Sequence, residues 1–116
     1  MPTPSRGEVW RVRFDPAEGA EMRKVRPSVV MSVGEVGVLP LRIIVPITEW
    51  KDAFAGRPWL VRLAATAGTG LRKESAADAF QIKSLSTDRF MERLGVLTEQ
   101  DIEEIAAAIV LCVGYI

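Results

Sequence analysis

Hydrophobic residues occur in short runs separated by loop-forming residues along most of the chain, a pattern typical of β-strands. Residues 8–14 (EVWRVRF) alternate strictly: Trp10, Val12 and Phe14 share one face, and arginines stand between them. We therefore expect a strand there with one buried face. Further strands are predicted over residues 28–33, 41–48, 59–65, 79–85 and 93–97. Pro46 lacks a backbone N–H, so strand pairing should weaken close to it.

The last part of the chain has the pattern of an amphipathic helix. Thr98 is a candidate N-cap, and Glu99 and Asp101 lie in the first turn, where acidic side chains favour the helix dipole. Apolar residues then recur at helical spacing at Ile102, Ile105, Ala106, Ile109, Cys112 and Val113. Five or more short strands followed by one helix predict a mainly β fold, in which a small, strongly bent sheet or barrel packs against the C-terminal α-helix.

Length and composition indicate a single globular domain, residues 1–116. A chain of 116 residues can form one core, and its 48% hydrophobic content is that of an ordered chain. The first residues have no apolar stretch like that of a signal peptide, and the longest apolar run, residues 105–113, is too short to span a membrane. The single cysteine, Cys112, has no partner for an internal disulfide, which fits a reducing cytoplasm.

The charges are segregated although they sum to zero. Residues 1–93 hold all 15 cations but only 11 of the 15 acids, because the other four acids follow Arg93. A basic body of this kind is compatible with nucleic-acid binding. An acidic helix N-terminus beside an ordinary surface would also account for much of it.

The chain contains no histidine, which removes the commonest general base and the commonest metal ligand. With one cysteine only, zinc sites and nucleophiles activated by histidine are excluded. The glycine motifs of phosphate loops and dinucleotide sites are also absent. Any catalysis must therefore rely on Arg, Lys, Asp, Glu, Ser, Thr, Tyr or Gln.

The order of several short motifs resembles the MazF/PemK toxins of bacterial toxin–antitoxin systems. These motifs are Arg6-Gly7-Glu8, Asp15-Pro16, Gly19, Glu21, Arg26-Pro27, VPIT at residues 45–48, Ser75 and Gln81-Ile82-Lys83. The resemblance implies an SH3-like small β-barrel with a C-terminal helix and a cytoplasmic homodimer. It also implies a sequence-specific endoribonuclease (an mRNA interferase) that cleaves single-stranded RNA without a metal or other cofactor. A cognate antitoxin would block its site.

Three residues in these motifs are candidates for catalysis: Arg26, Thr48 and Glu21. RNA carries its own nucleophile, the 2′-hydroxyl beside the scissile phosphate, so the protein must remove a proton and stabilise developing charge. Arg26, held by Pro27 and the strand after it, matches phosphate oxygens with its planar fork. Alternatively it closes a loop and pairs with Glu18 or Glu21. Thr48 can donate to the same oxygens, and Glu21 is the nearby candidate for a general base.

Candidate RNA contacts are Arg23, Lys24, Trp50, Ser75, Gln81 and Lys83. Gln81 and Lys83 alternate with Ile82 and so can share one sheet face, which could contact RNA or simply face solvent. Trp50 follows a strand and could stack on a base. Arg23 and Lys24 are phosphate contacts or ordinary solvated charges, and Ser75 is a weaker candidate.

Two departures from the family pattern concern the polar contact at Met22 and the choice of substrate. Many members have Ser-Glu-Gln where this chain has Ala20-Glu21-Met22, and the loop at residues 50–58 does not align. The chain also ends Gly114-Tyr115-Ile116, loosely similar to the tail of the gyrase-poisoning CcdB toxins, which share the implied fold. The alternatives are therefore a CcdB-like poison and a non-catalytic SH3-like binding module.

Overall fold

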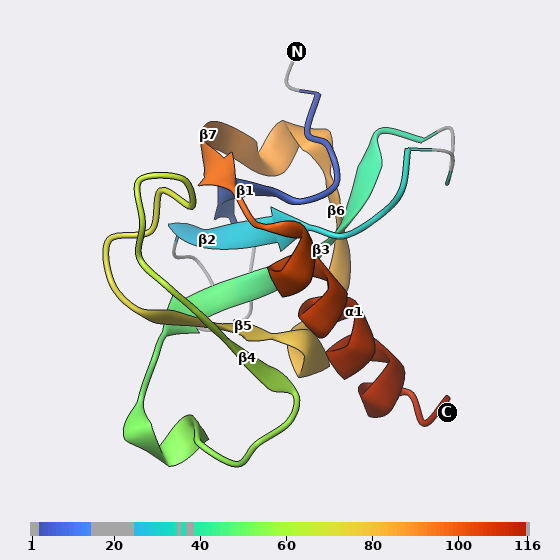
Figure 1. Ribbon diagram of the computed structural model, residues 1–116. Helices are drawn as coiled ribbons and strands as arrows, with labels where there is room; N and C mark the ends of the chain where they lie inside the picture. The colour runs from blue at the N-terminus through green and yellow to red at the C-terminus, as the bar shows by residue number, and fades with distance from the viewer. Residues whose placement is uncertain (1–2, 15–24, 35, 37–38, 116) are drawn as a thin grey trace.

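In the part of the chain that the computed structural model describes, residues 3–14, 25–34, 36 and 39–115, seven strands and one α-helix form the fold (Figure 1). The strands are β1 (Glu8–Arg13), β2 (Val25–Val30), β3 (Leu41–Glu49), β4 (Leu60–Leu63), β5 (Ser75–Asp78), β6 (Lys83–Ser86) and β7 (Phe90–Val96). Helix α1 spans Glu99–Cys112. Within the described ranges, three 3-10 turns connect strands: η2 (Asp52–Phe54), η3 (Ala79–Gln81) and η4 (Thr87–Arg89).

The strands pair antiparallel in the order β4-β5-β3-β2-β1-β7, and β6 pairs with β3. Strand β3 is the centre of the sheet because it has three partners. Its residues 41–44 pair with β6, residues 44–46 with β2, and residues 47–49 with β5. Pairing with β2 therefore ends at Pro46, as the missing N–H predicted, and β3 continues beside a different strand.

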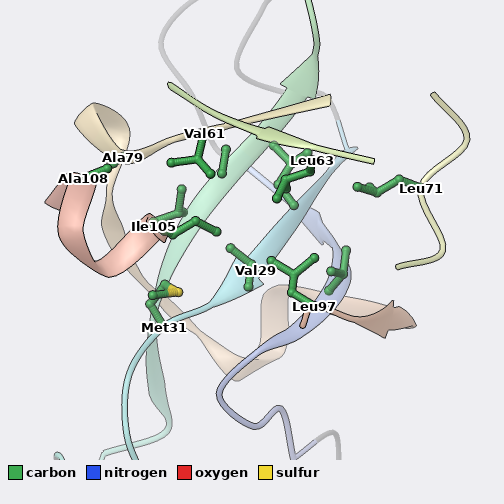
Figure 2. Close-up of a cluster of buried hydrophobic side chains, with 13 residues drawn as sticks. Val29, Met31, Val61, Leu63, Leu71, Ala79, Leu97, Ile105 and Ala108 are labelled. Atoms are coloured by element: carbon green, nitrogen blue, oxygen red, sulfur yellow. The ribbon is translucent and has the colours of Figure 1, made fainter. Parts of the chain in front are cut away.

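Each face of the sheet has its own hydrophobic core, because successive residues of a strand point to opposite faces. One cluster lies under α1, and Figure 2 shows Ile105 and Ala108 of the helix in this cluster with Val29 of β2. The other cluster consists of Val12, Phe14, Val30, Ile44 and Phe90, with Trp10 and Leu85 packed against it. The predicted buried face of β1 is confirmed, and Trp10 contacts Phe90 edge-to-face with ring centroids 5.8 Å apart.

Strand pairing does not close the sheet: among the described residues, β4 and β7 are its two ends. The loop between β4 and β5 instead packs across the end of β7. The Val96 N–H donates to the Gly68 carbonyl at 2.9 Å. Gly95 lies so close that a Cβ atom there would overlap the backbone of Gly68 and Thr69. The sheet is thus bent and barrel-like with one C-terminal helix, which confirms the predicted fold class.

Helix α1 begins as predicted, with the Thr98 hydroxyl accepting a hydrogen bond from the Asp101 N–H at 3.1 Å. Its inward face includes Ile105, which is fully buried, and Ala108. The predicted face was wrong at Val113, whose side chain is 71% exposed, because the helix ends at Cys112.

Strand β2 has limits different from those predicted. It covers Val25–Val30 rather than residues 28–33, so Arg26 and Pro27 lie inside the strand. Pro27 is tolerated there because β3 pairs with β2 only at Ser28–Val30, which leaves Pro27 with β1 as its one neighbour in the described sheet.

The strand predicted over residues 79–85 was wrong in its first half, where the chain forms η3. Strands β5 and β6 pair with separate parts of β3, so the chain between them must bridge from one part to the other. Asp78 caps this turn by accepting a hydrogen bond from the Phe80 N–H. The strand resumes at Lys83 as β6.

Candidate functional site

Arg26 and Thr48 occupy facing positions on β2 and β3. The register pairs Ser28 with Pro46, and two residues further along each strand stand Arg26 and Thr48. At this level β3 pairs with β5 instead, through Thr48 and Ala76. The two side chains therefore lie on the same face of neighbouring strands, at the point where those strands stop pairing.

Two cavities flank this position, and Arg26 and Thr48 line both of them. The first cavity has a volume of about 390 Å³ and is also lined by Phe14, Pro46, Phe54, Asp78, Gln81 and Lys83. The second cavity has a volume of about 450 Å³ and is also lined by Arg11, Pro27, Ile47, Glu49, Gly70, Leu71, Arg72, Lys73, Ser75 and Leu94. Volumes of this size are typical of ligand sites, which occupy roughly 300–1,000 Å³.

The first cavity combines aromatic surface with charged and amide groups. Phe14 is buried, and the Lys83 ammonium lies 5.2 Å from the centre of its ring, a cation–π contact that positions the charge. Asp78 accepts a hydrogen bond from the Gln81 amide at 2.9 Å. Gln81 and Lys83 both line this cavity, but they do not share a strand face as predicted, because Gln81 ends η3 and Lys83 begins β6.

The second cavity is predominantly basic. Its four cations are Arg26, Arg11, Arg72 and Lys73, against a single acid, Glu49. The Lys73–Glu49 pair spans 3.7 Å, and both side chains are largely exposed, so this pair is weak. Ser75 also lines the cavity, and its hydroxyl donates to the Lys73 carbonyl at 2.8 Å.

Arg26 is half-buried, and its side chain forms no hydrogen bond or ion pair with another residue that the structure describes. Among the described residues, nothing therefore occupies the donors of this guanidinium at the wall between two cavities. Several predicted participants lie outside the described residues: Glu18, Glu21, Met22, Arg23 and Lys24.

Trp50 is not placed in either cavity. Its ring meets Phe54 edge-to-face at 5.7 Å, and the Arg62 guanidinium lies 4.6 Å from the ring centre. Glu74 fixes that guanidinium through two hydrogen bonds of 2.9 Å, which also lower the pKa of the Glu74 carboxyl. Arg62 therefore covers one face of the indole that was predicted to stack on RNA.

Sequence reasoning missed several residues that line the cavities: Arg11, Phe14, Phe54, Arg72, Lys73 and Asp78. A signal was present for Arg72 and Lys73, since the pair directly precedes Glu74-Ser75 in a glycine-rich segment. Phe54 belongs to the loop that did not align.

No group of three or more His, Cys, Asp or Glu side chains suited to a metal ion occurs among the described residues. No helix in that part of the chain is long and apolar enough to cross a membrane.

Comparison with known proteins decides the family. Residues 5–113 match the family described as the PemK-like, MazF-like toxin of type II toxin–antitoxin systems. The chain belongs to this family. It is similar to endoribonuclease MazF9 of Mycobacterium tuberculosis, with 33% identity over 112 residues, or 91% of this chain and 92% of that protein.

Solved structures have the same fold as this MazF-like toxin. MazF from Deinococcus radiodurans matches with a TM-score of 0.78 and 25% identity, over 98% of this chain and 99% of that one. An endoribonuclease from a mycobacterial species, in complex with its cognate antitoxin, matches with a TM-score of 0.74 and 21% identity, over 97% and 96%. The family match favours the MazF-like interpretation over a CcdB-like poison or a non-catalytic module.

The three residues of the Arg6-Gly7-Glu8 motif of this MazF-like toxin make contacts within the fold and line neither cavity. The Arg6 guanidinium donates to the Met31 carbonyl, and Gly7, at φ +90°, packs so closely on Ile102 of α1 that a side chain would clash. The Glu8 carboxylate accepts hydrogen bonds from the Trp10 indole and the Ser5 N–H and pairs with Arg93 of β7. Burial disfavours the charged form of Glu8, but these contacts outweigh it and lower the pKa of the carboxyl.

Proposed function

We propose that this MazF-like endoribonuclease toxin cleaves single-stranded RNA by using the substrate's own 2′-hydroxyl as the nucleophile. The observation that carries the proposal is the position of Arg26 and Thr48, which face each other at the wall shared by two cavities. A phosphate at this wall would receive a charged fork and a neutral hydroxyl donor. The RNA on either side of it would occupy the two cavities.

The reaction needs no attacking group from the protein. The 2′-oxygen bonds to phosphorus as its proton leaves, the bond from phosphorus to the 5′-oxygen breaks, and that oxygen takes up a proton. Arg26 stabilises the charge on the non-bridging oxygens, because a guanidinium binds two phosphate oxygens at once. Thr48 donates to the same oxygens. Glu21 remains our candidate for the base that takes the 2′-proton, and a pH–rate profile can test this role.

The remaining predicted RNA contacts divide between the two cavities. Gln81 and Lys83 would contact the strand in the first cavity, and Ser75 in the second, beside Arg72 and Lys73. Basic groups of this kind neutralise backbone phosphates, so RNA affinity should fall with salt.

We infer two protein partners, a cognate antitoxin and a second copy of this chain. A type II toxin is neutralised by a cognate antitoxin, and the mycobacterial relative of the same fold was solved with its own antitoxin. The exposed apolar residues near the end of α1 support a homodimer, since monomers rarely leave such surface uncovered. They are Val110, Leu111, Val113 and Tyr115. An RNA substrate places the action of the toxin in the cytoplasm.

The decisive experiment replaces one 2′-hydroxyl. Cut sites are first mapped on a transcript mixture, and an oligonucleotide with a single site is then made with one deoxynucleotide directly 5′ of the scissile phosphate. We expect no cleavage of this oligonucleotide, whereas the same substitution two nucleotides further upstream should leave cleavage intact. The unmodified substrate should yield a 2′,3′-cyclic phosphate and a 5′-hydroxyl end, at a rate that excess chelator does not change.

Three results would refute this mechanism. Cleavage of the deoxy-substituted bond would mean that another nucleophile attacks the phosphorus. A 5′-phosphate on the product, or inhibition by chelator, would indicate water activated by the protein or by a metal.

A further inference from the structure

The first cavity combines stacking surface with both kinds of hydrogen-bonding group, which is the chemistry of a nucleobase site. Phe54 and Pro46, both partly exposed, supply apolar surface, Lys83 supplies donors, and Asp78 supplies acceptors. Unpaired RNA bases stack on aromatic side chains and are recognised by hydrogen bonds to their edges. The second cavity, with four cations and one acid, suits phosphates instead.

Asp78 is held in place and still has acceptor capacity. Its two carboxylate oxygens accept from the Phe80 N–H at 3.2 Å and from the Gln81 amide at 2.9 Å. Since an ionised carboxylate has about four lone-pair positions, about two remain for a ligand. No Lys or Arg among the described residues forms an ion pair with Asp78. A carboxylate without a cation partner repels a phosphate and attracts a neutral group that donates hydrogen bonds.

We propose that the first cavity holds one base of the substrate beside the scissile phosphate and selects a base with an exocyclic amino group, with Asp78 as the discriminating acceptor. This inference rests on the proposed function. Adenine, cytosine and guanine each have an amino group next to a ring position that can complete a second hydrogen bond, to Lys83 or to the carboxylate. Uracil has a single N–H between two carbonyl oxygens, so its lone pairs face the carboxylate and the contact is unfavourable.

The test compares base preference in the wild type and in Asp78→Asn. Asparagine can still cap η3, because its carbonyl accepts from the Phe80 N–H, but its other atom presents N–H donors where the carboxylate presented an acceptor. Both proteins cleave a pool of randomised RNA, and 5′-hydroxyl ends are sequenced. At one position beside the cut, the wild type should disfavour uracil roughly tenfold or more, the size expected for one lost polar contact. Asp78→Asn should relax or reverse that preference there and nowhere else.

A matched control separates this effect from a change of charge. Asp88→Asn removes the same charge from the turn η4, at an exposed residue outside both cavities, and should keep the wild-type preference. If Asp78→Asn cleaves too slowly to map, the same preference is measured as affinity. The probes are oligonucleotides blocked by 2′-deoxy substitution at the cut that differ only in the base concerned.

The outcomes distinguish the inference from the proposed function. A wild type that accepts uracil at every position beside the cut would overturn the inference, as would an Asp78→Asn variant with an unaltered preference. A loss of cleavage that is uniform over all sequences, with unchanged relative affinities, would reassign Asp78 to a structural role. A wild type that cleaves no RNA would instead refute the proposed function.

Discussion

Replacement of Arg26 by alanine tests the candidate site most directly, because the structure predicts a large effect on rate and a small effect on stability. Arg26 has no hydrogen-bonding or ionic partner among the described residues, so its removal leaves none of them unpaired. The β1–β2 pairing at Val12 involves only backbone and is retained. We therefore expect the free energy of unfolding to fall by less than about 1 kcal/mol.

The expected rate effect is much larger. Loss of one donor that stabilises developing charge lowers rates by about 10²–10³, or about 2.7–4 kcal/mol of transition-state stabilisation. Arg26→Lys should fall between the wild type and alanine, since it keeps the charge but loses the fork. Arg57→Ala is the matched control: Arg57 is exposed and outside both cavities, so its removal changes total charge alone.

Single-turnover cleavage of an end-labelled oligonucleotide gives the rate, and thermal unfolding by circular dichroism checks the fold. An Arg26→Ala protein that melts like the wild type and cleaves as fast as Arg57→Ala would remove Arg26 from the site. A protein that is both unfolded and inactive would show that Arg26 stabilises β2, against the expectation above.

Two further predictions concern stability. The contacts that lower the pKa of Glu8 stabilise the fold fully above its ordinary value of 4.5, and this contribution is lost as the pH falls through the lower folded pKa. Glu8→Gln should therefore flatten the acid limb of the plot of unfolding free energy against pH, measured by urea titration at each pH. An unchanged limb would mean that other carboxyls cause the loss of stability in acid. Gly95→Ala should destabilise by about 1–3 kcal/mol, because its Cβ would displace the loop at Gly68, whereas Gly34→Ala, with open space around it, should not. Equal melting temperatures for the two variants would contradict this contact.

The elements predicted well from the sequence are those whose signals are local. The alternation of β1 and the Thr98 cap depend on residues within one strand or one helical turn, and both are confirmed. The predicted start of β2 was wrong because Pro27 was interpreted as the end of a loop. A proline is compatible with a strand where one neighbour is missing, and that depends on where β3 leaves β2, which no local pattern reveals.

The candidate site was predicted only in part, again because the sequence reveals mainly local signals. Arg26, Thr48, Gln81 and Lys83 stand in recognisable motifs, and they do line the cavities. Asp78 was missed although it carries a local signal. An Asp side chain that accepts a hydrogen bond from the backbone N–H two residues later is typical of a turn, and Asp78 accepts from Phe80 in this way. The alternation of polar and apolar residues after it concealed that turn.

The exchange of pairing partners along β3 explains why Arg26 and Thr48 line two cavities. Up to Pro46 the strand is bonded to β2, and from Ile47 onward it is bonded to β5, so β2 and β3 separate where Arg26 and Thr48 face each other. The residues before this point remain fixed, because Ile44, Val45 and Ile47 are buried in the two cores on either face of the sheet. The opening therefore provides space for a ligand between two side chains whose strands are paired directly before it. Charge stabilisation in a transition state requires donors that are held in place before the reaction, and a rigid sheet that opens at one level meets that requirement without any histidine.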